Sequence, residues 1–376
     1  MQDRLALAKL RALARRKGAL ALCLALCTLG LAATARAQTN IAFDAPGAGT
    51  SAGQGTFAYT INPSGTITGF TRDTNFVRHA FLRDKKGNFT IFDAPGAGTS
   101  AGQGTRAYGI NAAGTITGWY NGDTGPAHGY VRTAGGTFTQ FDAPDAGTGD
   151  FNTTGQGTFS FTEGVINNPG GSTGTYVDSN GANHGFVRAP DGTLIEFDPT
   201  GSVFTFPTAI NSAGTVVGYW QDSSLATHGF LRAPDGTITP FDVPGDAGGT
   251  FPSALLPTGA IEGNWVDASG VNHGFVGFPW AFTTFDVSVA GTGSGQGTIP
   301  NNNNPSGAIS GQYFDSSSAS HGFLRSKKGV ITTFDAPGAG TCAFCGTTPL
   351  GINPSGAISG FEQDGSFVFH GFLYIP

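Results

Sequence analysis

Residues 107–144 read AYGINAAGTITGWYNGDTGPAHGYVRTAGGTFTQFDAP, and this stretch divides into four short runs that favour β-strands. We expect strands at 107–111, 115–120, 128–132 and 137–141. Each run is rich in β-branched or aromatic residues, and Gly, Pro, Asn or Asp bounds it. Four antiparallel strands in so short a segment are typical of one blade of a β-propeller.

The same pattern recurs along the rest of the chain. Each histidine stands in a His-Ala-Phe, His-Gly-Phe or His-Gly-Tyr triplet, 44 to 56 residues from the next, and a Phe-Asp pair follows the same rhythm. A period in this range indicates a propeller or a solenoid. The histidines are His79, His128, His184, His228, His273, His321 and His370. The Phe-Asp pairs begin at Phe43, Phe92, Phe141, Phe197, Phe241, Phe285 and Phe334.

The two ends of the repeat region decide between these architectures. The region begins with a fourth strand at 41–44 and finishes with a third strand at 370–375. Seven complete sets form only if the first strand joins the last set, which would also remove the open sheet edges. A linear solenoid would instead need atypical capping repeats. We therefore expect an all-β, seven-bladed β-propeller over residues 38–376, closed by its N-terminal strand (3+1).

Residues 1–37 have the features of a secretory signal peptide. A basic start precedes the apolar run 19–33, and Ala35-Arg36-Ala37 is a small-x-small cleavage site. The apolar run is shorter than the roughly 20 residues of a spanning helix, which argues against a retained anchor. We expect a secreted or periplasmic protein with no membrane span after cleavage.

Removal of this segment changes the charge of the chain. It takes seven of the 19 Lys and Arg residues and one of the 25 Asp and Glu residues, which leaves 12 basic and 24 acidic residues and a formal charge of −12. So acidic a protein is not expected to bind nucleic acid or an anionic membrane.

Two cysteines remain beyond the signal peptide, Cys342 and Cys345. In an oxidising compartment this spacing predicts a local disulfide that closes a loop. The alternative, a redox-active pair, normally stands at the start of a helix, and the flanking Gly and Thr residues show no helical period.

An aspartate follows the second strand of every repeat, five or six residues before the histidine. Such a pair can form a hydrogen bond across the loop, or the aspartate can cap backbone N–H groups. Ser/His/Asp catalysis needs one unique arrangement, whereas this pair occurs seven times, so we interpret it as structural. These aspartates are Asp73, Asp123, Asp178, Asp222, Asp267, Asp315 and Asp364.

The loop from Asp178 to His184 is rich in oxygen ligands and resembles a calcium loop. It lacks the further carboxylates of a strong calcium site. We expect no metal and no cofactor, with calcium as the open alternative.

The long loops after the second strand and between blades should share one face of the molecule, and this face is the expected binding surface. Four of the inter-blade loops contain Gly-Gln-Gly-Thr, which could approach a ligand or could simply connect blades. Aromatic residues end several second strands nearby, where they could stack on a sugar or pack against the next blade. The candidate ligand-binding residues are Gln54, Gln103, Gln156, Gln296, Trp119, Tyr120, Trp220 and Trp265.

The chain resembles the extracellular repeat family named for its His-Ala-Phe motif, the HAF repeats. The motif stands literally at 79–81, and an accompanying Ile-Asn-x-x-Gly-x-Ile/Val-x-Gly stretch stands at 61–69, 110–118 and 210–218, with a relaxed form at 352–360. The resemblance implies export and a repeat architecture, but no activity and no catalytic residues. Repeats 3 and 5 depart from the pattern, so we expect distortion in both.

These features favour an exported, non-enzymatic propeller that binds a glycan or a protein partner through its loop face. A hydrolase or lyase that acts on extracellular polysaccharide, and a purely structural envelope or matrix protein, are the alternatives. Enzymatic propellers break their symmetry at the active site, and no repeat has a unique cluster of His, Ser or carboxylate residues. The glutamates beyond the signal peptide are scattered over four repeats, as Glu163, Glu196, Glu262 and Glu362.

Overall fold

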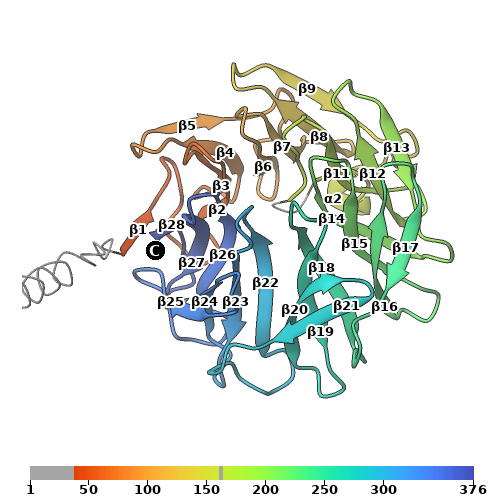
Figure 1. Cartoon of the computed structure of the whole chain (residues 1–376). Helices are drawn as coiled ribbons and strands as arrows, with labels where there is room; N and C mark the ends of the chain where they lie inside the picture. Colours follow the sequence, from red (N-terminus) through yellow and green to blue (C-terminus); the bar gives the residue numbers. More distant parts are fainter. Residues whose placement is uncertain (1–37, 161–163) are drawn as a thin grey trace, which may run out of the picture. The chain divides into compact units, whose positions relative to one another are not determined.

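The computed structural model of the chain describes residues 38–160 and 164–376, of which Thr39–Ile375 form one compact unit. The signal peptide predicted at 1–37 lies outside the described residues. The described part of the chain contains 28 strands and one short helix, α2 (Phe151–Thr154) (Figure 1). The all-β prediction is confirmed.

The strands pair in four-stranded antiparallel sets, each formed mainly by one repeat. The first set contains β2 (Gly55–Ile61), β3 (Ile67–Arg72), β4 (Arg78–Arg83) and β5 (Phe89–Phe92). The second contains β6 (Gly104–Ile110), β7 (Ile116–Asn121), β8 (Ala127–Arg132) and β9 (Phe138–Phe141). The third contains β10 (Gly157–Phe159), β11 (Ser172–Val177), β12 (Asn183–Arg188) and β13 (Leu194–Phe197).

Three further sets continue in the same order of strands. The fourth contains β14 (Phe204–Ile210), β15 (Val216–Gln221), β16 (Thr227–Arg232) and β17 (Ile238–Phe241). The fifth contains β18 (Gly249–Leu255), β19 (Ile261–Val266), β20 (Asn272–Phe278) and β21 (Ala281–Phe285). The sixth contains β22 (Gly297–Asn303), β23 (Ile309–Phe314), β24 (Ser320–Arg325) and β25 (Ile331–Phe334).

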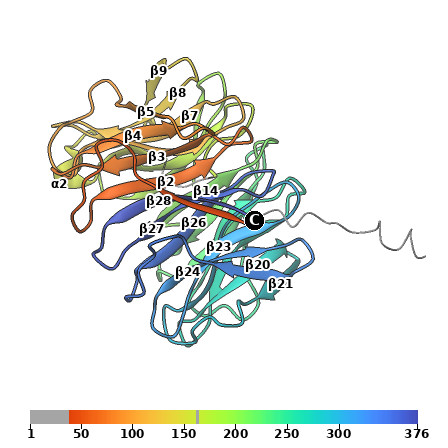
Figure 2. The same ribbon diagram turned by 90° about the vertical axis from the view of Figure 1, so that its left-hand side faces the viewer.

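The last set joins the two ends of the compact unit. It contains β26 (Gly346–Ile352), β27 (Ile358–Gln363), β28 (Phe369–Ile375) and, as its fourth strand, β1 (Thr39–Phe43). β1 pairs antiparallel with β28 in a register that runs from Thr39↔Ile375 to Phe43↔Gly371 (Figure 2). The predicted pairing of the first strand with the last set is confirmed, and β1 covers the edge that β28 would otherwise expose.

Each set is joined to the preceding set near the start of its own first strand. Gly104 of β6, for example, forms a parallel bridge with Arg78 of β4 in the preceding set. A Cβ atom at Gly104 would lie 2.1 Å from the carbonyl oxygen of Arg78, and the φ of +106° also disfavours other residues. The Gly-Thr half of Gly-Gln-Gly-Thr therefore begins a strand. The predicted start of this strand at residue 107 was three residues too late.

The hydrophobic core lies between successive sets. Between the last set and the first, Phe43 and Leu373 pack against Phe81 and Ile67. The aromatic residue of each histidine triplet is almost completely buried, which is worth roughly 1.5–3 kcal/mol per ring. These residues are Phe81, Tyr130, Phe186, Phe230, Phe275, Phe323 and Phe372.

Repeat 3 is irregular, as predicted. Its first strand, β10, has three residues where the other first strands have seven, and Ile166 forms only an isolated bridge with Ser172. The prediction for repeat 5 was wrong. β18 has the same length as β14 and β22, and it shows the register shift that those strands also show.

The structure joins Cys342 and Cys345 by a disulfide bond in the loop between β25 and β26. A backbone hydrogen bond of 2.9 Å from Cys345 to Cys342 closes the same turn. The bond therefore closes a local loop.

Deletion of residues 39–43 should destabilise the whole unit. It removes the buried contacts of Phe43 and should lower the free energy of unfolding by at least about 3 kcal/mol. It should also cause concentration-dependent association, because β28 becomes an open edge. Thermal melting and analytical ultracentrifugation measure the two effects.

Ile41→Thr is the matched control, because Ile41 lies on the exposed side of β1. It should melt within a few degrees of the parent chain. A deletion variant that melts like the parent would refute the closing role of β1.

Candidate functional site

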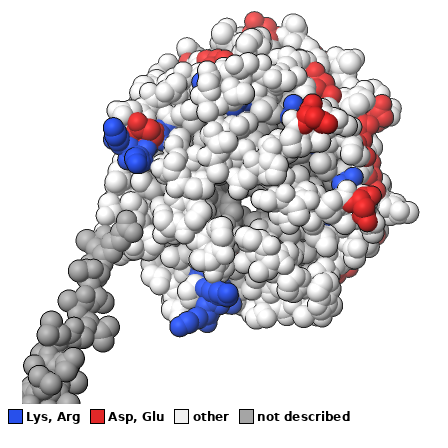
Figure 3. Space-filling model, turned by 45° about the horizontal axis from the view of Figure 1, so that its top comes forward, with Lys and Arg blue, Asp and Glu red and all other residues white. Residues whose placement is uncertain are grey.

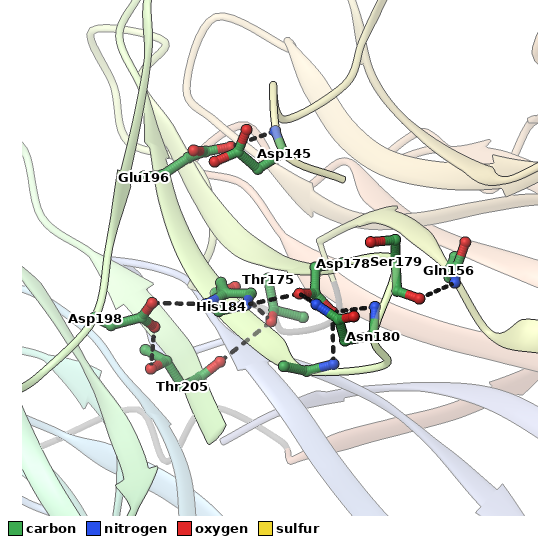
Figure 4. Close-up of polar contacts among 11 residues, drawn as sticks. Asp145, Gln156, Thr175, Asp178, Ser179, Asn180, His184, Glu196, Asp198 and Thr205 are labelled. Carbon is green, nitrogen blue, oxygen red and sulfur yellow. Dashed lines mark hydrogen bonds and ion pairs between the residues drawn. The ribbon is translucent and has the colours of Figure 1, made fainter. Parts of the chain in front are cut away.

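Six of the seven histidines of the repeat lie beside two aspartates, as repeat 3 illustrates (Figure 4). Nδ1 of His184 lies 2.6 Å from Asp198, the aspartate of the Phe-Asp pair, and Nε2 lies 3.8 Å from Asp178. Asp178 also accepts hydrogen bonds of 2.8 Å from the backbone N–H groups of Asn180 and Ala182. The loop aspartate therefore caps its turn, and the closer partner of the histidine is the Phe-Asp aspartate.

This arrangement recurs with little variation. All seven histidines place Nδ1 2.6–3.1 Å from a Phe-Asp carboxylate. Six of the seven loop aspartates cap two backbone N–H groups, and Asp123 is the exception. The histidine pairs are His79–Asp93, His128–Asp142, His184–Asp198, His228–Asp242, His273–Asp286, His321–Asp335 and His370–Asp44.

The electrostatics of the His79–Asp93 pair favour a charged histidine. The hydrogen bond from Asp93 raises the pKa of His79 above its usual value; burial opposes this shift, and the charges of Asp93 and Asp73 add to it. Since both ring nitrogens of His79 already face carboxylates, the pair is suited to hold the third and fourth strands together.

The candidate aromatic residues divide between the two faces of their sheets. Tyr120, Trp220 and Trp265 stand opposite a histidine, and their ring centroids lie 4.5–5.3 Å from the imidazole. Trp119 is one residue earlier in its strand, so its side chain lies on the opposite face. It packs against Phe159 and the helical residue Phe151 near the centre of the unit.

The side chains of the candidate glutamines form hydrogen bonds within the protein. Oε1 of Gln54 accepts from the N–H of Ser51, and its Nε2 donates to the carbonyl of Thr74, both at 3.0 Å. The side-chain oxygens of the other three likewise accept from the backbone of their own loop, and two of their amides donate to a neighbouring loop. These residues are Gln103, Gln156 and Gln296. The hydrogen bonds of these four glutamines therefore stabilise their own loops and connect them to neighbouring loops.

A cavity of about 450 Å³ lies near the start of β2 and β6, on the side of the long loops. We call it the loop-side cavity. Helix α2, which belongs to the longest repeat, contributes Phe151 to its wall. Aromatic rings and three arginines line it: Phe57, Tyr59, Phe70, Tyr108, Trp119, Phe151, Phe361, Phe369, Arg72, Arg78 and Arg106, together with Gly102.

The three arginines are held by neutral groups. Arg106 donates to the carbonyl of Gly102 at 2.8 Å and to Oδ1 of Asn121 at 2.9 Å, and its guanidinium stacks 3.7 Å above Trp119. Arg78 donates to the same Gly102 carbonyl. Arg72 donates to the carbonyl of Gly53 at 3.1 Å and lies 4.7 Å from the ring of Phe57.

Burial lowers the pKa values of all three arginines, and Coulombic repulsion adds to this effect at Arg78 and Arg106. The effect is largest at Arg106, where burial comes first and the charge of Arg78 second, and the pKa falls to about 9. The pKa of Arg78 falls to about 10 for the same reasons, with Arg72 as the repelling charge. Arg78 and Arg106 therefore remain cationic at neutral pH.

The sequence analysis did not identify Arg72, Arg78 and Arg106 as candidate ligand-binding residues, although their positions in the repeat set them apart. Five of the eight arginines beyond the signal peptide stand two residues after the triplet aromatic, where each covers the Phe ring of the preceding set. Arg72, Arg78 and Arg106 do not occupy this position. Their place outside the repeated position could have identified them as candidate ligand-binding residues.

A second cavity, of about 460 Å³, lies on the side of the short turns and is lined by residues of all seven sets. We call it the turn-side cavity. Among residues 38–160 and 164–376 no charged residue lines it, and the face in Figure 3 likewise carries its charges around a central hollow. Asparagine side chains around it donate to the next set, as from Asn62 to the carbonyl of Asn111 at 3.3 Å. Leu256 occupies the equivalent place in the fifth set.

Within residues 38–160 and 164–376, no three His, Cys, Asp or Glu side chains are grouped as metal ligands. No helix in these same ranges is long and apolar enough to cross a membrane.

Solved structures show what the fold resembles. The virginiamycin B lyase from Staphylococcus aureus aligns with a TM-score of 0.54 at 14% identity, over 90% of this chain and 99% of that chain. A streptogramin B lyase aligns with a TM-score of 0.53 at 16% identity, over 89% and 97%. The BP39L lectin from Burkholderia pseudomallei aligns with a TM-score of 0.51 at 11% identity, over 84% and 93%.

The fold is of the β-propeller type. At these identities the likeness concerns the fold alone, which hosts both lyases and lectins. No protein-family model and no curated protein sequence matches the chain.

The His79–Asp93 pair predicts that the stability of the folded chain depends on pH. Because the pKa of His79 is higher in the folded chain than the roughly 6.5 of an unfolded histidine, its ion pair stabilises fully below pH 6.5. This contribution is lost as the pH rises through the raised pKa. Asp93→Asn should therefore lower the free energy of unfolding by roughly 0.2–1 kcal/mol more at pH 5.5 than at pH 8.5.

Asp84→Asn is the control, because hydrogen bonds from Asn88 lower the pKa of Asp84. Its contribution is present above the unfolded pKa and is lost only in acid, so its effect should be the same at pH 5.5 and pH 8.5. Urea unfolding at the two pH values measures both variants. An Asp93→Asn effect that is larger at pH 8.5 would contradict the ion pair.

Proposed function

We propose that the chain is an exported, seven-bladed propeller of HAF-type repeats that binds a glycan in the loop-side cavity. The observation that carries the proposal is the place where the repeat breaks down. Seven sets share one His–Asp framework, but the loop-side cavity is built from residues that differ between sets, including Trp119 and Phe151. A ligand site in a repeat protein requires such a departure from symmetry.

The dimensions and chemistry of the cavity suit a small saccharide. Its volume of about 450 Å³ falls in the range of about 300–1,000 Å³ that is typical of ligand sites. Aromatic rings such as Phe57 and Trp119 offer apolar surfaces, and the arginines nearby offer hydrogen-bond donors. This combination of stacking surface and directed donors favours a sugar.

The export proposal depends on the basic start, apolar run and cleavage site of residues 1–37. The resemblance to HAF repeats agrees with it, and so does the formation of a disulfide between Cys342 and Cys345. A protein ligand is the alternative partner, since the long loops around the cavity could also contact a larger surface.

A hydrolase or lyase activity is the second candidate, and Glu362 is the observation that favours it. In five sets an aromatic ring covers the histidine, but in the last set Glu362 stands opposite His370. Burial raises the pKa of Glu362 to about 7; the charge of His370 opposes this shift, and Asp364 and Asp44 add to it. A carboxyl group with this pKa could act as a general acid or base.

The binding proposal predicts different effects at the two cavities. Phe151→Ala removes part of the wall of the loop-side cavity and leaves every strand residue in place, and it should weaken glycan binding by at least tenfold. Ser212→Phe obstructs the turn-side cavity and should leave binding unchanged. A glycan array identifies ligands, and isothermal titration calorimetry then compares the variants.

Binding that survives Phe151→Ala but is lost in Ser212→Phe would place the ligand on the opposite side. Breakdown of a bound glycan that stops in Glu362→Gln would instead favour the enzymatic candidate.

A further inference from the structure

We propose that the glycan bound in the loop-side cavity carries an anionic group, a carboxylate or a sulfate, which contacts Arg72, Arg78 and Arg106. This inference rests on the proposed function and defines the chemical class of its ligand. The acidic saccharide would place its anion among the guanidinium groups and its ring against the aromatic wall.

The three guanidinium groups converge on one place. Arg78 and Arg106 donate to the same carbonyl, that of Gly102, although they belong to different sets. Arg72 pairs directly with Arg78 across β3 and β4, so the two side chains leave the same face of the sheet. Each of the three lines the cavity.

Their positive charge has no compensation among the described residues. These arginines donate to backbone carbonyls and to the side-chain amide oxygen of Asn121, all of them neutral. The electrostatic partners that affect their pKa values are tyrosines and one another. Burial of a cation without a partner of opposite charge is unfavourable, and here three such groups lie close together.

Arginines at the repeated position provide the contrast. Burial lowers the pKa values of Arg83, Arg188 and Arg232. The charges of Asp84, Asp191 and Asp235, respectively, oppose this shift. These acidic neighbours stabilise the charged guanidinium, and each of these side chains covers a phenylalanine ring of the preceding set. The same chain therefore places a carboxylate near an arginine that acts only as a structural element.

The surrounding charges favour a small anion over a large polyanion. The paired aspartates of all seven repeats lie on the loops and strand ends outside the cavity, and the chain beyond residue 37 carries a formal charge of −12. This field repels an extended polyanion such as nucleic acid. A short acidic saccharide meets the cationic centre without lying across the acidic rim.

Arginine is suited to this task because its planar fork donates two parallel hydrogen bonds to a carboxylate or a sulfate. Stacking on Trp119 fixes the orientation of the Arg106 guanidinium at 3.7 Å. A hydrogen bond to a charged group contributes about 1.5–3 kcal/mol, which corresponds to about a tenfold to hundredfold change in affinity.

Calorimetric titration of the full chain with paired probes tests the inference. Trigalacturonic acid and its methyl ester differ in the charge of their carboxyl groups and in the ester methyl groups, and galactose 6-sulfate and galactose differ only in the sulfate. At least one acidic probe should bind ten times more tightly than its neutral partner. Arg78→Gln should abolish that difference, because it should weaken binding of the acidic probe at least tenfold and binding of its neutral partner much less.

Arg188→Gln is the matched control and should alter binding by less than twofold. Arg78→Lys retains the charge but lacks the fork, and should restore part of the affinity. Thermal melting of each variant, with and without the acidic probe, separates a binding defect from misfolding, because a ligand of the folded state raises the melting temperature.

Equal affinities for acidic and neutral probes, unchanged in Arg78→Gln, would overturn the anionic ligand. If Phe151→Ala still removed the binding, the glycan proposal itself would stand. Failure of both acidic probes to bind would also overturn the inference, and the neutral members of the glycan array would then decide the broader proposal.

Discussion

The fold depends on the position of one phenylalanine ring in each repeat, that of the Phe-Asp pair. In the last set the ring of Phe43 covers Gly371 so closely that a Cβ atom there would lie 2.4 Å from it. The same ring packs on Phe89 and beneath Arg83 of the first set. One residue thus fixes the third strand to the fourth and each set to its successor, while the adjacent aspartate holds the histidine.

The repeat pattern made much of this architecture predictable. The closing pair β1 and β28 followed from the incomplete sets at the two ends, because an open edge is unfavourable. The close pairing of histidine with the Phe-Asp aspartate was not predicted, since the two residues are 13 or 14 positions apart in six repeats and at opposite ends of the chain in the seventh. Only the register of the third and fourth strands brings them together.

The candidate site was predicted less completely. Trp119 and Trp220 looked equivalent in the sequence, but a shift of one residue places them on opposite faces of their strands. Arg106 was overlooked because its strand was expected to begin at residue 107. The expected place of Trp119 near the long loops agrees with the structure. The contacts of the cavity depend on three different sets and on α2, which no local sequence pattern reports.

The protein combines a symmetric framework of His–Asp pairs with an asymmetric loop-side cavity. The central claim is that the ligand binds in this cavity. A crystal structure of the protein with trigalacturonic acid tests this claim most directly. The account predicts electron density for the sugar in the loop-side cavity, with a carboxylate within hydrogen-bond distance of Arg78 or Arg106. Density in the turn-side cavity, or at a His–Asp pair on the rim, would contradict it.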